Sequence, residues 1–443
     1  MLKALNHPGR LIPVLFSVVL TLGTVLLCLP VSRTADGPPN VLAGAFTAVS
    51  ATCITGLSVV DTATYWTPFG QGVIMALIQV GGFGIMTLAT LLAILVSGRL
   101  GLRQSLVAQA ESHARELGDV GAIIRTVGVS MITVEGAIAA LLTWRFATRY
   151  DQDLPSALWN GSFHAVSAFN NAGFGLYSDN LMGFNQDAFV IAPICFAIIA
   201  GGVGFPVFYE LSRRWRKPES WTMHTRVTIL GYFGLLGAGT LAFGVYEWNN
   251  AETLGPMNLW GKLLNTFAGG VMPRTAGFNT IDYSKAHAET WAVDDVMMFI
   301  GGGSAGTSGG IKVGTFVLLA FVLWAEIRGE PEVIIGHRTV PTAAQREAIT
   351  VALLAIGVVA LGSMGILAVT DHSLDRVVFE AISAFGTTGL STGITSELPG
   401  AAQLILMALM YVGRVGTITT ASALALNRRH RHYNLPEERP IIG

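Results

Sequence analysis

The sequence has few charged residues, and this scarcity narrows the class of protein. Only 12% of its 443 residues are Asp, Glu, Lys or Arg, whereas soluble domains carry about a quarter. Lys and Arg (27) nearly balance Asp and Glu (28), so the chain lacks the positive excess of a nucleic-acid binder. Hydrophobic residues make up 51%, and the mean hydropathy is +0.55. These values exclude an ordinary soluble enzyme and a nucleic-acid partner, and the expected partner is membrane lipid.

Cysteine is also scarce. Cys28, Cys53 and Cys195 all lie in apolar surroundings, and their spacing fits neither a metal site nor a disulfide framework. Because the cysteines have no such spacing, we expect no covalently bound cofactor. No long charged or low-complexity tract interrupts the apolar segments, which excludes disorder.

The sequence does contain long apolar stretches. A helix needs about 20 mostly apolar residues to span a bilayer, and eight stretches have this length. They are 11–30, 72–98, 120–144, 188–211, 226–245, 291–324, 349–370 and 401–426. If residue 1 is cytoplasmic and the spans alternate, most Lys and Arg residues lie on the inner side, so the positive-inside rule places both termini in the cytoplasm. The sequence predicts an all-α polytopic membrane protein with about eight transmembrane helices.

Between the spans of each pair lies a segment too apolar for a solvated loop and too short to cross the membrane. Each segment has a Phe and, ten residues later, a Gly: Phe46 and Gly56, Phe163 and Gly173, Phe267 and Gly277, Phe379 and Gly389. In three of them the fifth residue is Ser, namely Ser50, Ser167 and Ser383. This spacing predicts four tandem repeats of span, short helix, glycine-bearing strand and span. We assign the repeats to residues 1–98, 99–217, 218–328 and 329–443.

Each repeat contains two spans, so all four copies have the same orientation and can surround one axis along the membrane normal. Non-helical backbone at membrane depth persists only where protein buries it or water reaches it, so the four strands are expected to converge on a pseudo-four-fold central pore. A ring of their carbonyls could replace the hydration shell of a cation. The predicted ion-binding residues are Ile54, Thr55, Gly56, Asn171, Ala172, Gly173, Thr275, Ala276, Gly277, Thr387, Thr388 and Gly389.

The four glycine motifs resemble those of the Ktr/Trk/HKT superfamily of potassium-uptake proteins. They read Thr52-Cys-Ile-Thr-Gly-Leu57, Asn170-Asn-Ala-Gly-Phe174, Arg274-Thr-Ala-Gly-Phe-Asn279 and Gly386-Thr-Thr-Gly-Leu390. The resemblance covers essentially the whole chain, and the length is most similar to a Ktr-type membrane subunit. Cys53 departs from the Thr that Ktr-type relatives often have at this place.

The resemblance to this superfamily implies a function and partners. It implies K⁺ bound at the filter residues in preference to Na⁺, with Na⁺ as a candidate activator. It also implies a bacterial plasma membrane, a membrane homodimer and a cytosolic ring of nucleotide-binding (RCK-type) regulatory subunits.

The sixth predicted span is interrupted by a glycine-rich segment, residues 301–310, where each Gly costs a helix about 1 kcal/mol relative to Ala. Gly301 to Gly306 matches G-x-G-x-x-G, but no βαβ unit surrounds it, which disfavours nucleotide binding. Ser304 could be the nucleophile of an intramembrane protease, but no span carries a His as its base. We favour a loop below the filter that blocks the pore, which resembles the intramembrane gating loop of the superfamily. The predicted gating residues are Gly301, Gly302, Gly303, Ser304, Gly306, Thr307, Ser308, Gly309, Gly310, Lys312 and Arg414.

Three charged residues fall within or beside predicted spans. A lipid-facing charge costs about 2.5–3.5 kcal/mol even on a lenient scale, so Arg414 should face the interior. There it could touch the glycine-rich segment and act as an electrostatic brake on cations, as the matching Arg of the superfamily does, or it could only pair with Glu135 or helix carbonyls. Lys312 could snorkel at a helix end, and Glu135 could be a buried partner or face a subunit boundary.

The sequence therefore predicts the membrane subunit of a potassium-uptake system, with no catalytic residues. The alternative is a secondary transporter that couples cation entry to H⁺ or Na⁺ by alternating access, with Arg414 or Glu135 as a relay.

Overall fold

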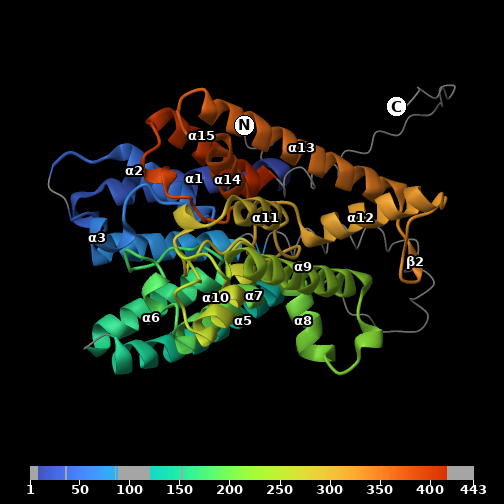
Figure 1. The fold of residues 1–443 in the computed structure, drawn as a ribbon, viewed down its shortest axis with the longest axis horizontal. Coiled ribbons are helices and arrows are strands. Elements are labelled where there is room, and N and C mark those ends of the chain that lie inside the picture. The colour runs from blue at the N-terminus through green and yellow to red at the C-terminus, as the bar shows by residue number, and fades with distance from the viewer. Residues whose placement is uncertain (1–7, 35–36, 85, 88–119, 151–152, 417–443) are drawn as a thin grey trace.

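The computed structural model describes residues 8–34, 37–84, 86–87, 120–150 and 153–416. Within these ranges the fold is mostly helical (Figure 1). The one departure from the predicted all-α class in the described chain is a short hairpin, β1 (Ile334–Ile335) and β2 (Arg338–Thr339), which turns at Gly336.

Among the described residues, three helices are long and apolar enough to cross a membrane unbroken. They are α5 (Val120–Arg149), α9 (Met223–Glu247) and α13 (Thr342–Leu367). Large apolar side chains on them point outward: Leu241, Val245 and Leu361 are 72%, 76% and 71% exposed. Exposed apolar surface of this kind marks contact with another apolar phase, which for helices of this length is lipid.

Four times along the chain, a long helix is followed by a short helix that packs against it. These pairs are α1 (Pro8–Cys28) with α2 (Val41–Thr52), α5 with α6 (Leu154–Phe169), α9 with α10 (Leu259–Val271), and α13 with α14 (Leu374–Gly386). Figure 1 shows the pair α5 and α6 on one side of the molecule and the pair α13 and α14 on the other. The four short helices coincide with the four apolar segments that precede the predicted filter glycines.

Capping side chains begin three of the short helices. Asn40, Asp153 and Asn258 each accept a hydrogen bond from the backbone N–H three residues later, at 3.1, 3.0 and 2.7 Å. Such caps satisfy one of the N–H groups that a helix leaves unpaired at its start. The backbone N–H and the hydroxyl of Ser156 lower the pKa of Asp153 below its usual value, which keeps this cap ionised.

The remaining elements connect these pairs. The helices are α3 (Thr62–Tyr65), a helix that includes residues 68–84, α7 (Ala188–Gly202), α8 (Phe205–Arg214), α11 (Ala288–Phe299), α12 (Val313–Arg328) and α15 (Gly400–Tyr411), which continues into a π-helical turn, η7 (Val412–Gly416). Short 3-10 turns lie at η2 (Pro30–Ser32), η3 (Met182–Phe184), η4 (Pro218–Ser220), η5 (Tyr283–Lys285) and η6 (Ile394–Ser396).

Two predicted spans are not continuous helices. The stretch 188–211 becomes α7 and α8, whose axes differ by 102°, because Gly204 adopts a φ of +97° between them and Pro206 favours a helix start. The stretch 291–324 becomes α11 and α12, separated by the glycine-rich segment. Parts of two other predicted spans, residues 88–98 and 417–426, lie outside the described residues.

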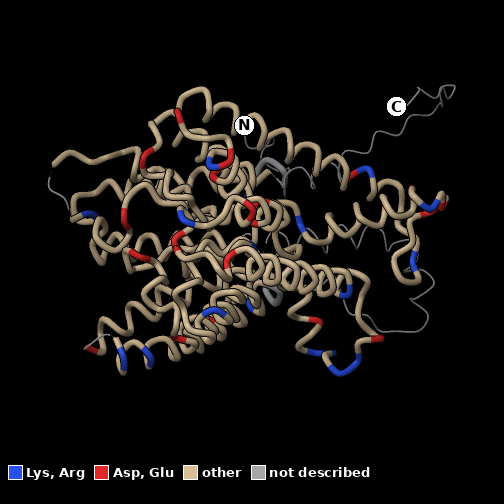
Figure 2. The backbone as a smooth tube through the Cα atoms, viewed as in Figure 1, with Lys and Arg blue, Asp and Glu red and all other residues tan. Residues whose placement is uncertain are grey.

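Charged residues are sparse along the long helices. Figure 2 shows the tubes of α9 and α13 as almost entirely uncharged, with Lys and Arg of α8 and of the β-hairpin gathered at one end of the molecule. Arg213 and Arg214 form the last turn of α8, and Arg338 lies in β2. The same region also carries acidic residues, among them Glu210 of α8 and Glu219 of η4.

Candidate functional site

The four predicted filter glycines face one another in a closed order. A Cβ atom added to Gly56 would lie 3.1 Å from the Cα atom of Gly173, and the corresponding distances are 2.9 Å from Gly173 to Gly277, 3.0 Å from Gly277 to Gly389 and 3.0 Å from Gly389 back to Gly56. Each glycine also has a positive φ, between +70° and +97°, which residues with a side chain rarely adopt. The cycle returns to its first residue, so the four glycines surround one common point.

The residue two places before each glycine has a positive φ as well. Ile54, Asn171, Thr275 and Thr387 have φ values of 52°, 56°, 69° and 50°, and all four are fully buried. Such backbone angles cost a non-glycine residue about 1–3 kcal/mol and persist only where the surroundings impose them. Alternation of left-handed and right-handed residues turns successive carbonyl oxygens to the same side of a strand.

Backbone N–H groups in these strands point back toward the short helices. Thr55, Ala172 and Thr388 donate to the carbonyls of Ser50, Ser167 and Ser383 at 2.7, 2.8 and 2.8 Å. The third strand differs slightly, because Ala276 donates to Met272 at 3.1 Å. With their N–H groups paired behind them, these strands keep carbonyl oxygens available as ligands for a cation.

The serine at the fifth place of the short-helix motif has a structural role in two strands. The Oγ atoms of Ser50 and Ser383 accept the N–H groups of Gly56 and Gly389, both at 3.0 Å. Within the described residues the Oγ atom of Ser167 has no hydrogen-bond partner, and the third motif has Val271 at this place. The four strands therefore share a backbone conformation, but the side-chain hydrogen bonds that hold them to the short helices differ.

The glycine-rich segment lies against the bend between α7 and α8. Gly303 donates its N–H to the carbonyl of Gly202 at 2.8 Å, and Thr307 donates to that of Gly201 at 3.2 Å. A Cβ atom on Gly306 would lie 3.0 Å from the Gly201 oxygen. The bend of α7 and the glycines of the segment thus allow two backbones to approach closely.

The same segment also touches the C-terminal ends of two short helices. Thr307 Oγ1 donates to the carbonyl of Phe169 at the end of α6, at 3.4 Å. A Cβ atom on Gly309 would lie 2.6 Å from the carbonyl oxygen of Gly386 at the end of α14. The segment therefore lies next to the residues where two of the glycine-bearing strands begin.

Arg414 and Lys312 both donate hydrogen bonds to this segment. Arg414 is 2% exposed, and its Nη1 donates to the carbonyl of Thr307. Lys312 Nζ donates to the carbonyl of Ser308, and to that of Gly309 at 3.4 Å. The structure thus brings the predicted gating residues together, and it places both cations on backbone oxygens of the segment.

Glu135 has a different set of partners from Arg414. Its Oε1 accepts from Asn170 Nδ2 at 3.0 Å, and its Oε2 accepts from Gln79 Nε2 at 2.9 Å. Asn170 is the residue that ends α6 and precedes the second glycine-bearing strand. Glu135 therefore supports the second strand from behind.

Arg274 is a further buried cation that the sequence reasoning did not single out. It is fully buried, its Nη2 donates to the carbonyl of Gly301 at 3.0 Å, and its guanidinium carbon lies 4.4 Å from the centre of the Tyr232 ring. Its position inside a short apolar segment, where a charge is costly, was the signal that could have identified it. With Arg274, three buried or half-buried cations hold carbonyls of the glycine-rich segment.

A second set of matching glycines follows the filter strands. Gly81, Gly201 and Gly413 each lie so close to the carbonyl at the end of the preceding short helix (Thr52, Phe169 and Phe385) that a Cβ atom would clash with it. The residues after them are Gly82, Gly202 and Arg414, and Gly302 follows Gly301 at the matching place of the third repeat. Arg414 therefore stands where the other three stretches have a glycine.

The surroundings of His164 bear on the protease alternative, which needs a base for Ser304. The ring nitrogens of His164 contact the Asn160 carbonyl and the Leu176 N–H. The described residues contain no group of three or more His, Cys, Asp or Glu that could hold a metal ion.

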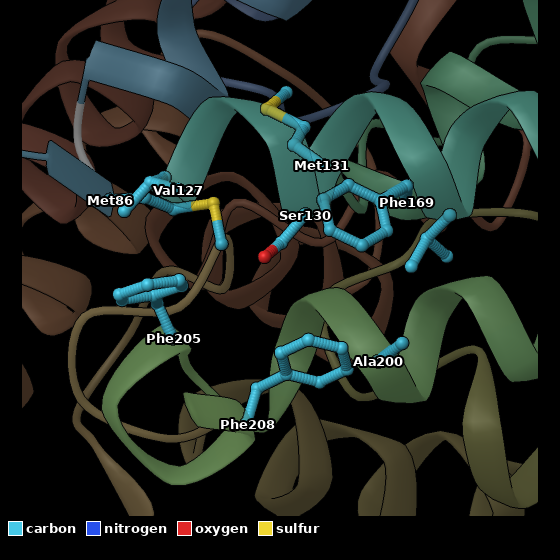
Figure 3. Close-up of a pocket in the computed structure, with 9 residues that line it drawn as sticks. Met86, Val127, Ser130, Met131, Phe169, Ala200, Phe205 and Phe208 are labelled. Carbon is cyan, nitrogen blue, oxygen red and sulfur yellow. The ribbon is translucent and has the colours of Figure 1, made fainter. Parts of the chain in front are cut away.

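A small pocket near α6 is apolar. It lies among α5, α7 and α8 and is lined by Met86, Val127, Ser130, Met131, Val134, Phe169, Ala200, Phe205 and Phe208 (Figure 3). Ser130 provides the one hydroxyl group among these residues, and its oxygen points toward the space between the helices in Figure 3. This lining offers no ligand set for an ion.

The fold and the glycine ring define an ion-transport protein of the membrane. The chain belongs to the TrkH family of cation transport proteins, which it matches over residues 13–430. It is a transport protein and not an enzyme.

Several relatives match nearly the whole chain. The Ktr system potassium uptake protein B of Bacillus subtilis (strain 168) is 36% identical over 94% of this chain and 93% of its own length. The protein of the same name from Vibrio alginolyticus is 35% identical over 96% and 92%, and the potassium/sodium uptake protein NtpJ of Enterococcus hirae is 31% identical over 98% and 97%. The crystal structure of the potassium transporter TrkH from Vibrio parahaemolyticus has a TM-score of 0.70 over 93% of this chain and 83% of that one. At 16% identity, that structure shows a common fold alone.

Proposed function

We propose that this chain is the ion-translocating subunit of a Ktr-type potassium-uptake system. In this proposal the four span, short helix, strand and span units surround one pore, and eight transmembrane helices carry them through the plasma membrane with both termini in the cytoplasm. The closed cycle of Gly56, Gly173, Gly277 and Gly389 is the observation that carries it. The names of the most similar relatives, which are potassium uptake proteins, support K⁺ as the ion.

The selectivity of the proposed filter follows from its backbone. A ring of carbonyl oxygens can replace the water around K⁺, and the N–H groups of Thr55, Ala172 and Thr388 are already paired with the short helices. Glycine in all four strands lets the backbones approach without side chains between them. The pore then conducts K⁺ in preference to Na⁺, driven by the membrane potential.

The proposed gate is the segment 301–310. Its contacts with the ends of α6 and α14 support a position directly below the filter. Arg274 and Arg414 hold its carbonyls and place positive charge beside the path of a cation, which raises the barrier to passage. Opening requires the segment to leave these carbonyl contacts.

The proposed assembly is a membrane homodimer beneath which a cytosolic ring of nucleotide-binding subunits docks. In this proposal the ring docks at the end of the bundle that carries Arg213 and Arg214 of α8 and Arg338 of β2. The name of the Enterococcus hirae relative, a potassium/sodium uptake protein, supports Na⁺ as a candidate activator.

Flux measurements on the purified protein test this function. Liposomes that contain only this protein should take up K⁺ or Rb⁺ when a negative interior potential is imposed, and excess Na⁺ should compete weakly. The rate should be unchanged when a proton gradient is collapsed at constant potential. Uptake that requires the proton or sodium gradient would instead favour the alternating-access transporter.

A further inference from the structure

The residue after the first Phe of each motif differs among the four short helices. These residues are Thr47, His164, Ala268 and Glu380. His164 and Glu380 are both fully buried, although a polar side chain is costly inside a membrane protein unless its hydrogen bonds are satisfied. Their partners show why the two positions carry large polar groups.

Glu380 holds the chain that leaves the fourth filter strand. Its Oε1 accepts from Ser391 Oγ at 2.6 Å and from the backbone N–H of Thr392 at 2.9 Å. The hydroxyl of Thr392 donates to the same oxygen at 3.3 Å, and Thr395 Oγ1 donates to Oε2 at 2.6 Å. One carboxylate therefore ties α14 to the segment just beyond Gly389.

His164 makes the corresponding contact in the second strand. Its Nε2 accepts the backbone N–H of Leu176 at 3.4 Å, while Nδ1 pairs with the Asn160 carbonyl at 2.7 Å. Since a carbonyl can only accept, Nδ1 carries the proton and Nε2 is the acceptor. The ring also stacks on Phe278, with centroids 6.4 Å apart, and Phe278 directly follows Gly277.

The two contacts are equivalent in register. Leu176 is the third residue after Gly173, and Thr392 is the third residue after Gly389. In the first helix the Oγ1 atom of Thr47 has no partner within the described residues, and in the third helix Ala268 has no side-chain acceptor. In the closed order of the glycines, Gly173 and Gly389 are not neighbours, so the tied strands lie across from each other.

We propose that His164 and Glu380 are positioning residues that fix the outer ends of two opposite filter strands and thereby set the discrimination between K⁺ and Na⁺. This inference rests on the proposed function, because it assumes that the glycine ring is the filter. A carbonyl cage selects an ion by the number and placement of its oxygens. An untethered strand end lets the cage contract around a smaller ion, and two tethers across the ring oppose that contraction.

Paired substitutions test the reach of each side chain. Gln places an amide oxygen near the position of His Nε2 or of the Glu carboxylate, whereas Asn at 164 and Asp at 380 are one methylene too short. The assay is liposome uptake with competing Na⁺. We expect His164→Gln and Glu380→Gln to keep the K⁺ preference within about twofold. His164→Asn and Glu380→Asp should lower the preference about tenfold, which is the effect of a lost buried hydrogen bond. Thr47→Val, at the matching place of the first helix, should leave the preference unchanged.

The outcomes separate this inference from the proposed function. If the short variants keep the wild-type preference, or if the long variants lose as much as the short ones, the positioning role is wrong. Gly277→Ser in the same assay reports on the filter itself, so a loss of preference there with intact short variants overturns only this inference. If the short variant at one position cannot be purified as a monodisperse protein, the pair of variants at the other position still tests the positioning role.

Discussion

Gly389 of the fourth strand faces Gly56 of the first. A Cβ atom on Gly389 would lie 3.0 Å from the Cα atom of Gly56, although the two residues are separated by most of the chain. This contact brings the last glycine-bearing segment next to the first, and it closes the succession of segments into a ring. Substitutions at the ring are therefore expected to act on its neighbours as well as on the altered strand.

Gly277→Ser should weaken the discrimination of K⁺ against Na⁺. Gly277 has a φ of +71°, and a Cβ atom there would lie 3.0 Å from the Cα atom of Gly389. Strain of about 1–3 kcal/mol has to be relieved by displacing the third and fourth strands, which distorts the carbonyl ring. The ratio of Rb⁺ uptake with and without Na⁺ measures this effect. Gly357→Ser, at a helix position with open space, is the control, and an unchanged ratio for Gly277→Ser would count against the filter.

Removal of residues 303–309 should raise the resting flux. The deletion takes away the carbonyl of Thr307, to which Arg414 donates, and the backbone groups that contact the α7–α8 bend. The measurement is K⁺ leakage from liposomes in the absence of any cytosolic subunit. Shortening the β-hairpin at Gly336, which lies away from the ring, is the control. A deletion variant as tight as the wild type would refute the gate.

Arg274→Met should also raise flux, and it should leave the ion preference unchanged. Met keeps most of the side-chain volume but loses the hydrogen bond from Nη2 to the carbonyl of Gly301. Since the bond anchors the first residue of the gating segment, its loss favours the open position. Uptake rate and selectivity are read in one assay. A lower ion preference with no gain in rate would show that Arg274 supports the filter instead of the gate.

Ser383→Ala should lower the K⁺ preference, whereas Ser167→Ala should have little effect. Ser383 Oγ accepts the N–H of Gly389 at 3.0 Å, and Ser167 Oγ has no partner within the described chain. A lost hydrogen bond of this type is worth about 0.5–1.5 kcal/mol, which corresponds to a few-fold change in the ratio. Equal effects of the two variants on the uptake ratio would contradict this assignment.

The spacing between Phe and Gly is easier to see in the sequence than the direction of the backbone. A fixed separation of ten residues between Phe and Gly was visible without coordinates, because a short helix and a strand of constant length impose it. The bend at Gly204 could not be seen in the sequence. A hydropathy profile averages composition over about 20 residues, and a single residue with a positive φ does not change that average. The stretch 188–211 therefore read as one span.

The support of the ring was also hidden from sequence reasoning. Arg274 lies three residues before Gly277, and the spacing of Phe and Gly that defines the motif does not depend on its charge. His164 and Glu380 occupy the same place in two repeats but have unlike side chains, so a comparison of residue types does not pair them. Only their common acceptance of an N–H three residues after the glycine relates them.

Arg414 follows Gly413, whereas the corresponding glycines Gly81, Gly201 and Gly301 are each followed by another glycine. An assembly of four identical polypeptides could place at that level either four guanidinium groups or none. In one continuous polypeptide this restriction does not hold, because each of the four stretches has its own sequence. Of these four matching positions only the fourth then carries a positive charge, and that guanidinium is held on one side, by the carbonyl of Thr307.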